Sequence, residues 1–124
     1  MNISLSFFKP RYVVHEVTGV VICYLEFTVN YPDVLDYLCM YKHNFYNRTF
    51  IVKAVTIVKD SDVFDEAKGK KIALAKAENK AYLMVKHYVK MAEKDLSSAI
   101  QTISDYNRKA DKVINHNIEY LKQF

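Results

Sequence analysis

The two halves of the chain differ in hydrophobic pattern and predict different elements. Four segments are rich in β-branched and aromatic side chains, which favour strands: residues 2–8, 12–17, 20–30 and 49–59. The third of these is apolar almost throughout, so we expect a central strand or one covered on both faces. Pro10 predicts a turn or an edge position, because proline cannot donate to a sheet ladder. Gly19 predicts a hairpin turn or a bulge between the second and third strands.

The second half predicts helix. After Gly69 the chain contains neither glycine nor proline, and its composition favours helix from residue 62 onward. Asp62 or Asp65 is expected to cap the first turn. Gly69 lies within the first two turns, where its plausible role is close approach of the helix to the sheet or to a ligand. A shorter helix is expected from Asp33 to about residue 42.

Two apolar stripes follow one another along the helical half. The first, in residues 70–94, has lysines on its opposite face: Lys68, Lys71, Lys76, Lys80, Lys86, Lys90 and Lys94. The second repeats in strict 4-3 spacing, which is the pattern of a coiled-coil seam: Leu96, Ile100, Ile103, Asn107, Ala110, Ile114, Asn117, Leu121 and Phe124. This seam predicts either an interface between copies of the chain or packing against the chain's own sheet.

These patterns predict an α+β fold in one domain, residues 1–124. Residues 1–60 are expected to be mostly β and residues 62–124 helical. The architecture is a small antiparallel sheet of three to four strands followed by long, coiled-coil-like C-terminal helices. Ser98 and Gln101 could form a capping box that starts a separate helix, so one long helix and a helical hairpin are both open.

Composition and charge narrow the function classes. The formal net charge is +4, but it comes from lysine-rich sequence with only Arg11, Arg48 and Arg108 as arginines, which favours nucleic-acid binding weakly. Cys23 and Cys39 lie in apolar contexts and are expected to be buried thiols rather than a disulfide framework. The chain has no signal peptide pattern and no apolar run of transmembrane length, so we expect a cytoplasmic protein without a membrane partner.

Known catalytic patterns are missing from the sequence. With Gly19 and Gly69 as its only glycines, the chain can form neither a P-loop nor a dinucleotide fingerprint. The four histidines are scattered, so we expect no metal site and no cofactor. Acidic residues cluster before the long helix, where helix capping explains them better than a metal or acid–base site: Asp60, Asp62, Asp65 and Glu66. We therefore expect a protein that is not an enzyme.

The charges around the strand-to-helix junction predict one anion-binding site. Lys70 and Lys71 lie one turn into the helix, whose N-terminus offers unpaired amides. Arg48 precedes the strand that leads to the junction. The acidic residues at the same end would repel an anion, so the prediction concerns a ligand held mainly by these three cations.

Residues 50–82 resemble a pattern found in small proteins of phages and prophages. The pattern combines a strand, the Asp-x-Phe-Asp step at Asp62–Asp65, Gly-Lys-Lys-x-Ala at Gly69–Ala73, and a helix. This chain departs from it at Lys53, where glycine is common, and at Lys76, where arginine is common. Some phage counter-defence proteins look similar in size and layout, including sponges that sequester nucleotide signals of the Thoeris system.

The resemblance implies a non-enzymatic phage accessory protein in the host cytoplasm. Its implied activity is inhibition of antiviral defence by binding or sequestering a nucleotide signal or a defence protein. The alternatives are a virion or assembly component that uses the helices as a scaffold, and a non-specific nucleic-acid binder. In each case we expect the chain to self-associate.

Overall fold

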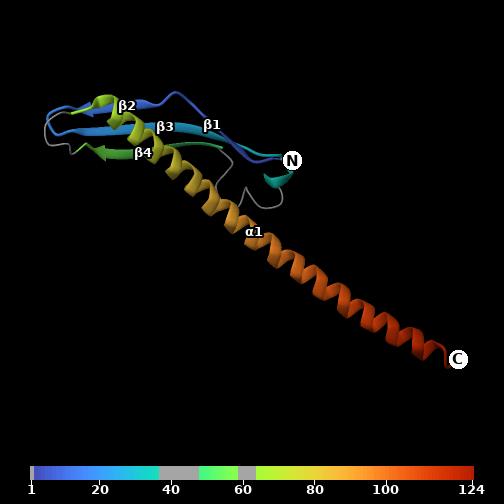
Figure 1. Ribbon diagram of the computed structural model, residues 1–124. Coiled ribbons are helices and arrows are strands. Elements are labelled where there is room, and N and C mark those ends of the chain that lie inside the picture. The colour runs from blue at the N-terminus through green and yellow to red at the C-terminus, as the bar shows by residue number, and fades with distance from the viewer. Residues whose placement is uncertain (1, 37–47, 59–63) are drawn as a thin grey trace.

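The computed structural model describes residues 2–36, 48–58 and 64–124. The described elements are, in chain order, β1 (Ser4–Phe7), β2 (Arg11–His15), β3 (Val20–Asn30), β4 (Thr49–Ile57) and α1 (Glu66–Leu121). Four antiparallel strands form one small sheet, and a single long helix follows them (Figure 1). The predicted α+β class and the order of sheet and helix are confirmed.

Strand β3 is the centre of the sheet. Its whole length pairs with β4 on one edge, while β1 and β2 share the other edge end to end. Between them the register shifts by one residue, because Phe7 pairs with Phe27 but Arg11 pairs with Tyr24. Pro10 lies in the resulting bulge, as expected for a residue that cannot donate to the ladder.

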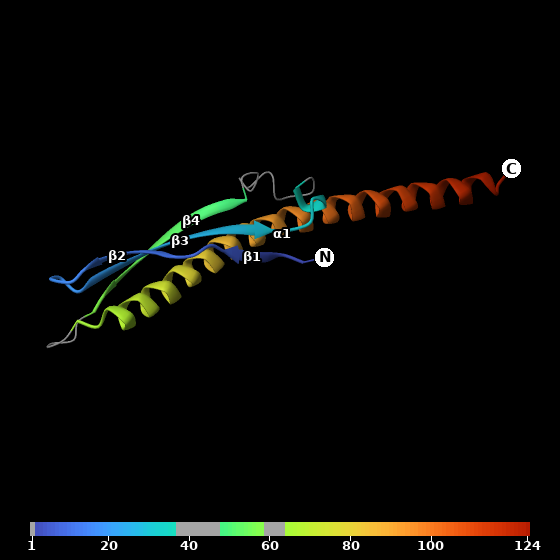
Figure 2. The ribbon, with the colours of Figure 1, turned by 90° about the horizontal axis from the view of Figure 1, so that it is seen from above.

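The two faces of β3 have different environments. Alternate side chains are fully buried against α1: Val21, Cys23, Leu25, Phe27 and Val29. The intervening residues point to the opposite face, which no described helix or strand covers (Figure 2). The expectation of a central strand is confirmed, whereas cover on both faces is wrong for the part of the chain that the structure describes, because α1 lies on one side only. Cys23 is a buried free thiol in this core.

Small residues let α1 approach the sheet closely. The buried positions of the helix follow one another mostly at four-residue spacing: Gly69, Ala73, Ala77, Ala81, Val85 and Ala92. Farther along, Leu96 still packs on the cluster formed by Phe27, Val29 and Tyr31. We call the sheet together with residues 66–96 of α1 the head.

Helix α1 is continuous from end to end. Asp65 caps it by accepting a hydrogen bond from the backbone N–H of Lys68 at 3.0 Å, which confirms one of the two predicted caps. The helical-hairpin alternative is wrong, because the backbone stays helical through Ser98 and Gln101. Fifty-six residues give a length of about 84 Å at 1.5 Å per residue. The C-terminal part of α1 extends away from the sheet (Figure 1), and we call residues 97–121, which follow Leu96, the projecting segment.

Two expectations fall partly outside the described residues. The chain turns into a helical conformation at residues 34–36, directly after Asp33, but the predicted continuation to residue 42 is not described. Asp60 and Asp62 of the acidic cluster also lie outside the described ranges. The remaining members, Asp65 and Glu66, form the cap and the first turn of α1.

Candidate functional site

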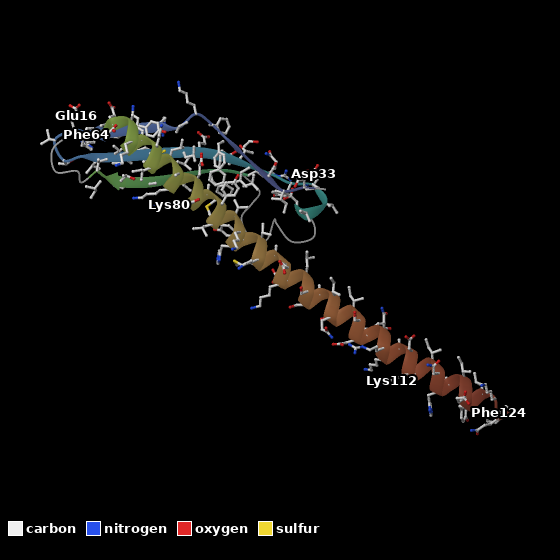
Figure 3. All side chains as sticks on the ribbon, in the orientation of Figure 1. Glu16, Asp33, Phe64, Lys80, Lys112 and Phe124 are labelled. Carbon is white, nitrogen blue, oxygen red and sulfur yellow. The ribbon has the colours of Figure 1, made fainter. Side chains whose placement is uncertain are left out.

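The projecting segment carries a broad, exposed apolar surface. Its seam residues Ile100, Ile103 and Ile114 are 63%, 61% and 54% exposed, and Leu121 at the end of the helix is 65% exposed. Figure 3 shows the side chains of this segment standing free of the sheet as far as Phe124. Packing of the seam against the chain's own sheet is therefore wrong for residues beyond Leu96. Exposed apolar surface of this extent typically marks an interaction site.

The seam has large apolar neighbours that the 4-3 repeat alone does not include. Tyr106, Val113 and Tyr120 each precede a seam residue and are 69%, 53% and 53% exposed. They widen the seam on one side, whereas the opposite side of the helix is charged. Arg108 pairs there with Asp105, and Lys122 pairs with Glu119 across one turn. The projecting segment is thus amphipathic although no described part of the chain covers its apolar side.

A second exposed apolar surface lies on the sheet. We call the side of the sheet opposite α1 the open face, and its apolar part is formed by neighbouring residues of three strands: Val13, Val20, Ile22, Ile51, Val55 and Ile57. Val13, Ile22 and Val55 form one cross-strand row. Sequence reasoning missed this face. The sequence of β4 carries no clear signal for it, because the residues on the open face, Ile51, Val55 and Ile57, are as apolar as those that face α1.

A row of charged and aromatic side chains crosses the open face beside its apolar part. Arg11 and Lys53 flank Tyr24 across the sheet, with cation-to-ring distances of 5.5 and 6.0 Å. Glu26 follows on the same face of β3 and is exposed. An apolar patch with a polar and aromatic border is typical of a protein-binding surface.

Arg48, the first predicted anion ligand, is engaged inside the head. Its guanidinium contacts Asp36 at 2.6 Å and Asp33 at 3.2 Å, and donates to the Tyr31 carbonyl at 3.0 Å. It also lies 3.7 Å from the centre of the Tyr31 ring. The Arg48 backbone adopts φ 53°, a left-handed conformation that is costly for a residue with a side chain. These contacts hold the strained residue in place and satisfy its charge.

The Arg48 cluster also shifts two pKa values. Hydrogen bonds from Tyr31 and Arg48 hold the pKa of Asp36 below its ordinary value. Burial, reinforced by the hydrogen bond to Asp36, raises the pKa of Tyr31 to about 12. The cluster is therefore an ionised Arg48–Asp36 pair bonded to a neutral phenol at neutral pH.

Lys70 and Lys71, the other predicted ligands, lie at the opposite end of the sheet. The backbone carbonyl of Arg48 bonds to Val29, whereas the helix start packs on Val21, eight residues or about 26 Å along β3. Lys70 pairs with Glu66 at 3.3 Å and lies 5.4 Å from the Tyr12 ring centre. The structure thus does not bring Arg48 together with the two lysines. The prediction grouped them because spacing along the sequence does not show which end of the sheet each residue occupies.

The surroundings of the helix start are acidic as well as basic. An open hollow of about 760 Å³ lies there, lined by residues 14–18 and Glu66. Both Glu16 and Glu66 place carboxylates on it, which opposes an anionic ligand. Binding of an anion by Lys70 and Lys71 stays a prediction.

Two of the lysines on α1 serve the sheet itself. Lys80 donates to the Lys53 carbonyl at 2.6 Å, and Lys76 to the Val55 carbonyl at 3.4 Å. Lys80 lies beside β4, the strand at the sheet edge (Figure 3). These carbonyls point away from β3 and would otherwise be free to pair with another strand. Two of the lysines opposite the first apolar stripe are therefore explained by protection of the β4 edge.

Comparisons with protein-family models, curated proteins and solved structures returned no match for this chain. Among the described residues, no helix has a run of apolar side chains that could cross a membrane. Residues 2–36, 48–58 and 64–124 contain no cluster of three or more His, Cys, Asp or Glu side chains arranged to hold a metal ion.

Proposed function

We propose that this protein is a non-enzymatic binding protein that works as a homo-oligomer joined through α1. The observation that carries the proposal is the exposed apolar repeat of the projecting segment. Each copy would otherwise keep this surface in water at a cost of about 25 cal/mol per Å² of apolar area. A helix with a 4-3 repeat is best matched by another helix with the same repeat, and a second copy supplies one.

The head supplies the surface for a further partner in this proposal. The open face combines β-branched side chains with the Arg11–Tyr24–Lys53 group, which suits a protein surface better than a small anion. Arg48 is occupied by Asp33 and Asp36, and Lys70 pairs with Glu66. These facts favour a protein target over a nucleotide signal.

The phage-like pattern in residues 50–82 suggests the setting for this binding activity. We propose inhibition of a host antiviral defence by capture of a defence protein, in the cytoplasm of the host. Sequestration of a nucleotide signal is the second form of the same proposal. A virion or assembly role and non-specific binding of nucleic acid are the competing outcomes.

Sedimentation of the purified protein at high micromolar concentration tests the oligomer. The wild type should sediment above the monomer mass, and the Ile103→Lys, Ile114→Lys variant should be monomeric with its head folded, since both side chains are exposed. A matched control, Lys109→Ala with Lys112→Ala, changes exposed side chains outside the seam and should stay oligomeric. A monomeric wild type would overturn the proposal.

Binding assays on the same proteins separate the partner classes. Calorimetric titration with cyclic nucleotides and ADP-ribose derivatives should give no heat if the target is a protein. Binding that is lost in a Lys70→Glu, Lys71→Glu variant would support the nucleotide form instead. Retention on DNA that falls steeply with added salt would identify a nucleic-acid binder.

A further inference from the structure

The apolar side of the projecting segment continues the side of α1 that packs on the sheet. Steps of seven residues keep a helical position on nearly the same face, with a drift of about 20°. Two buried or half-buried positions of the head therefore extend into the projecting segment. Ala92 continues as Ala99, Tyr106, Val113 and Tyr120. Leu96 continues as Ile103, Ala110, Asn117 and Phe124.

This continuity limits how a second helix can lie on the seam. Helices pack on helices and on sheets at similar distances, roughly 10 Å. A partner helix that follows the seam toward the head therefore runs into the core cluster that holds Val29 and Tyr31, against which Leu96 packs. In a parallel, in-register pair, residues 66–96 of the partner would occupy the volume that the sheet already fills. An antiparallel partner avoids the collision, because its head lies beyond the other chain's C-terminus.

We infer that two copies pair antiparallel through residues 100–124, with residue 112 of one helix level with residue 112 of the other. This inference rests on the proposed self-association and specifies its geometry. In this register Asn107 lies opposite Asn117 of the second copy, so each seam amide meets another amide. Phe124 reaches the level of Ile100, one turn short of Leu96, which packs on the core cluster of the head.

The other layers of this register are complementary in size. Ile103 lies opposite Leu121 of the second copy, and the small Ala110 lies opposite the larger Ile114. In parallel pairing Ala110 would instead meet its own copy and leave a gap, which costs stability.

The widened side of the seam also favours the antiparallel register. Positions that flank the seam on the same side face each other in an antiparallel pair, so Tyr106 meets Tyr120 and Val113 meets its own copy. In a parallel pair Tyr106 would instead flank Asp111 of the partner. The two exposed tyrosines therefore cover each other only when the helices run in opposite directions.

Disulfide trapping tests this geometry. Two single-cysteine additions, Ile103→Cys and Leu121→Cys, are made in full-length chains that carry Cys39→Ser, while the fully buried Cys23 is kept. The antiparallel register predicts that an oxidised mixture of the two variants gives a covalent dimer containing one chain of each. Each variant alone should stay uncrosslinked, because residue 103 lies about 27 Å from its own copy. Cross-linking of each variant with itself, or no cross-linking in the mixture, would overturn the inference.

A double-mutant cycle at the two asparagines gives a second measurement. If Asn107 faces Asn117, replacing either one by isoleucine leaves the other amide against an apolar side chain. The double variant restores an apolar layer. Each single variant should therefore dimerise at least tenfold more weakly than it would if the effect of the double variant were the sum of two independent effects. Additive effects would indicate parallel pairing. A wild type that sediments as a monomer would overturn the proposed function, whereas a dimer with additive effects overturns only the antiparallel register.

Discussion

Gly69 of α1 faces Val21 of β3 so closely that a Cβ atom at residue 69 would lie 2.7 Å from Val21 Cγ2. The same atom would lie 3.0 Å from Val58 Cγ2. Val21 is fully buried and β-branched, so it has little freedom to move aside. The predicted close approach of the helix to the sheet at Gly69 is confirmed.

Replacement of Gly69 should therefore destabilise the head. Valine gains a few tenths of a kcal/mol in helix propensity over glycine, so any loss must come from the contact. We expect Gly69→Val to lower the free energy of unfolding by about 1–3 kcal/mol, the usual cost of overpacking. The control Ala75→Val, at an exposed position of the same helix, should cost only about 0.5 kcal/mol. Equal melting temperatures for the two variants would contradict the contact.

Loss of the Lys80 ammonium should expose the edge of the sheet. In Lys80→Ala the Lys53 carbonyl loses its 2.6 Å donor, and we expect a small loss of stability, about 0.5 kcal/mol. The larger effect should be faster aggregation, because an unprotected edge can pair with another strand. Light scattering of concentrated samples measures this against Lys86→Ala, an exposed lysine of the same helix. If both variants aggregate at the same rate, Lys80 does not protect the edge.

The Arg48 cluster predicts two pH limits for stability. Because the pKa of Asp36 is lower in the folded protein than its ordinary 3.8, its contribution is present above that value and is lost as the pH falls below it. The pKa of Tyr31 is raised from 10.0 to about 12, so its contribution is complete below pH 10 and is lost between pH 10 and 12. Urea unfolding across the pH range should show a flatter acid limb in Asp36→Asn and a flatter alkaline limb in Tyr31→Phe. Curves parallel to the wild type would argue against these shifts.

Thr56 offers a stabilising substitution. Its side-chain hydroxyl is buried and finds no hydrogen-bond partner within the described part of the chain. Thr56→Val keeps the shape and removes the unsatisfied group, so we expect a gain of about 1–2 kcal/mol. Thr28→Val is the matched comparison and should lose stability, because the Thr28 hydroxyl contacts the Thr49 hydroxyl at 3.3 Å. A loss in both variants would show that Thr56 is satisfied in solution.

Local signals along the sequence predicted most of the helices and strands. The features that were not predicted depend on contacts between residues far apart in the sequence. The strands, the Asp65 cap and Gly69 each depend on a few neighbouring residues, so their pattern was readable. Arg48 was wrongly grouped with the helix start, because only the register of β4 on β3 shows that it lies at the far end.

Whether the seam is covered or exposed also depends on long-range geometry. The 4-3 repeat was visible in the sequence, but whether the chain's own sheet covers Ile103 depends on how far the core extends along α1, and Leu96 still packs on it. The open face was missed because its exposure depends on the number of layers. Val55 and Ile57 read as ordinary strand residues until one helix is seen to cover one side only.

The proposed self-association would make folding of the free end of α1 depend on protein concentration. Helices in proteins owe most of their stability to packing rather than to propensity, and the projecting segment has no other described part of the chain against which to pack. In a dilute sample these residues would exchange between helix and coil, and their backbone amides would exchange hydrogen rapidly. Association would then supply the missing contacts and complete the helix. With the proposed self-association, the amount of ordered backbone in each molecule would depend on how many copies surround it.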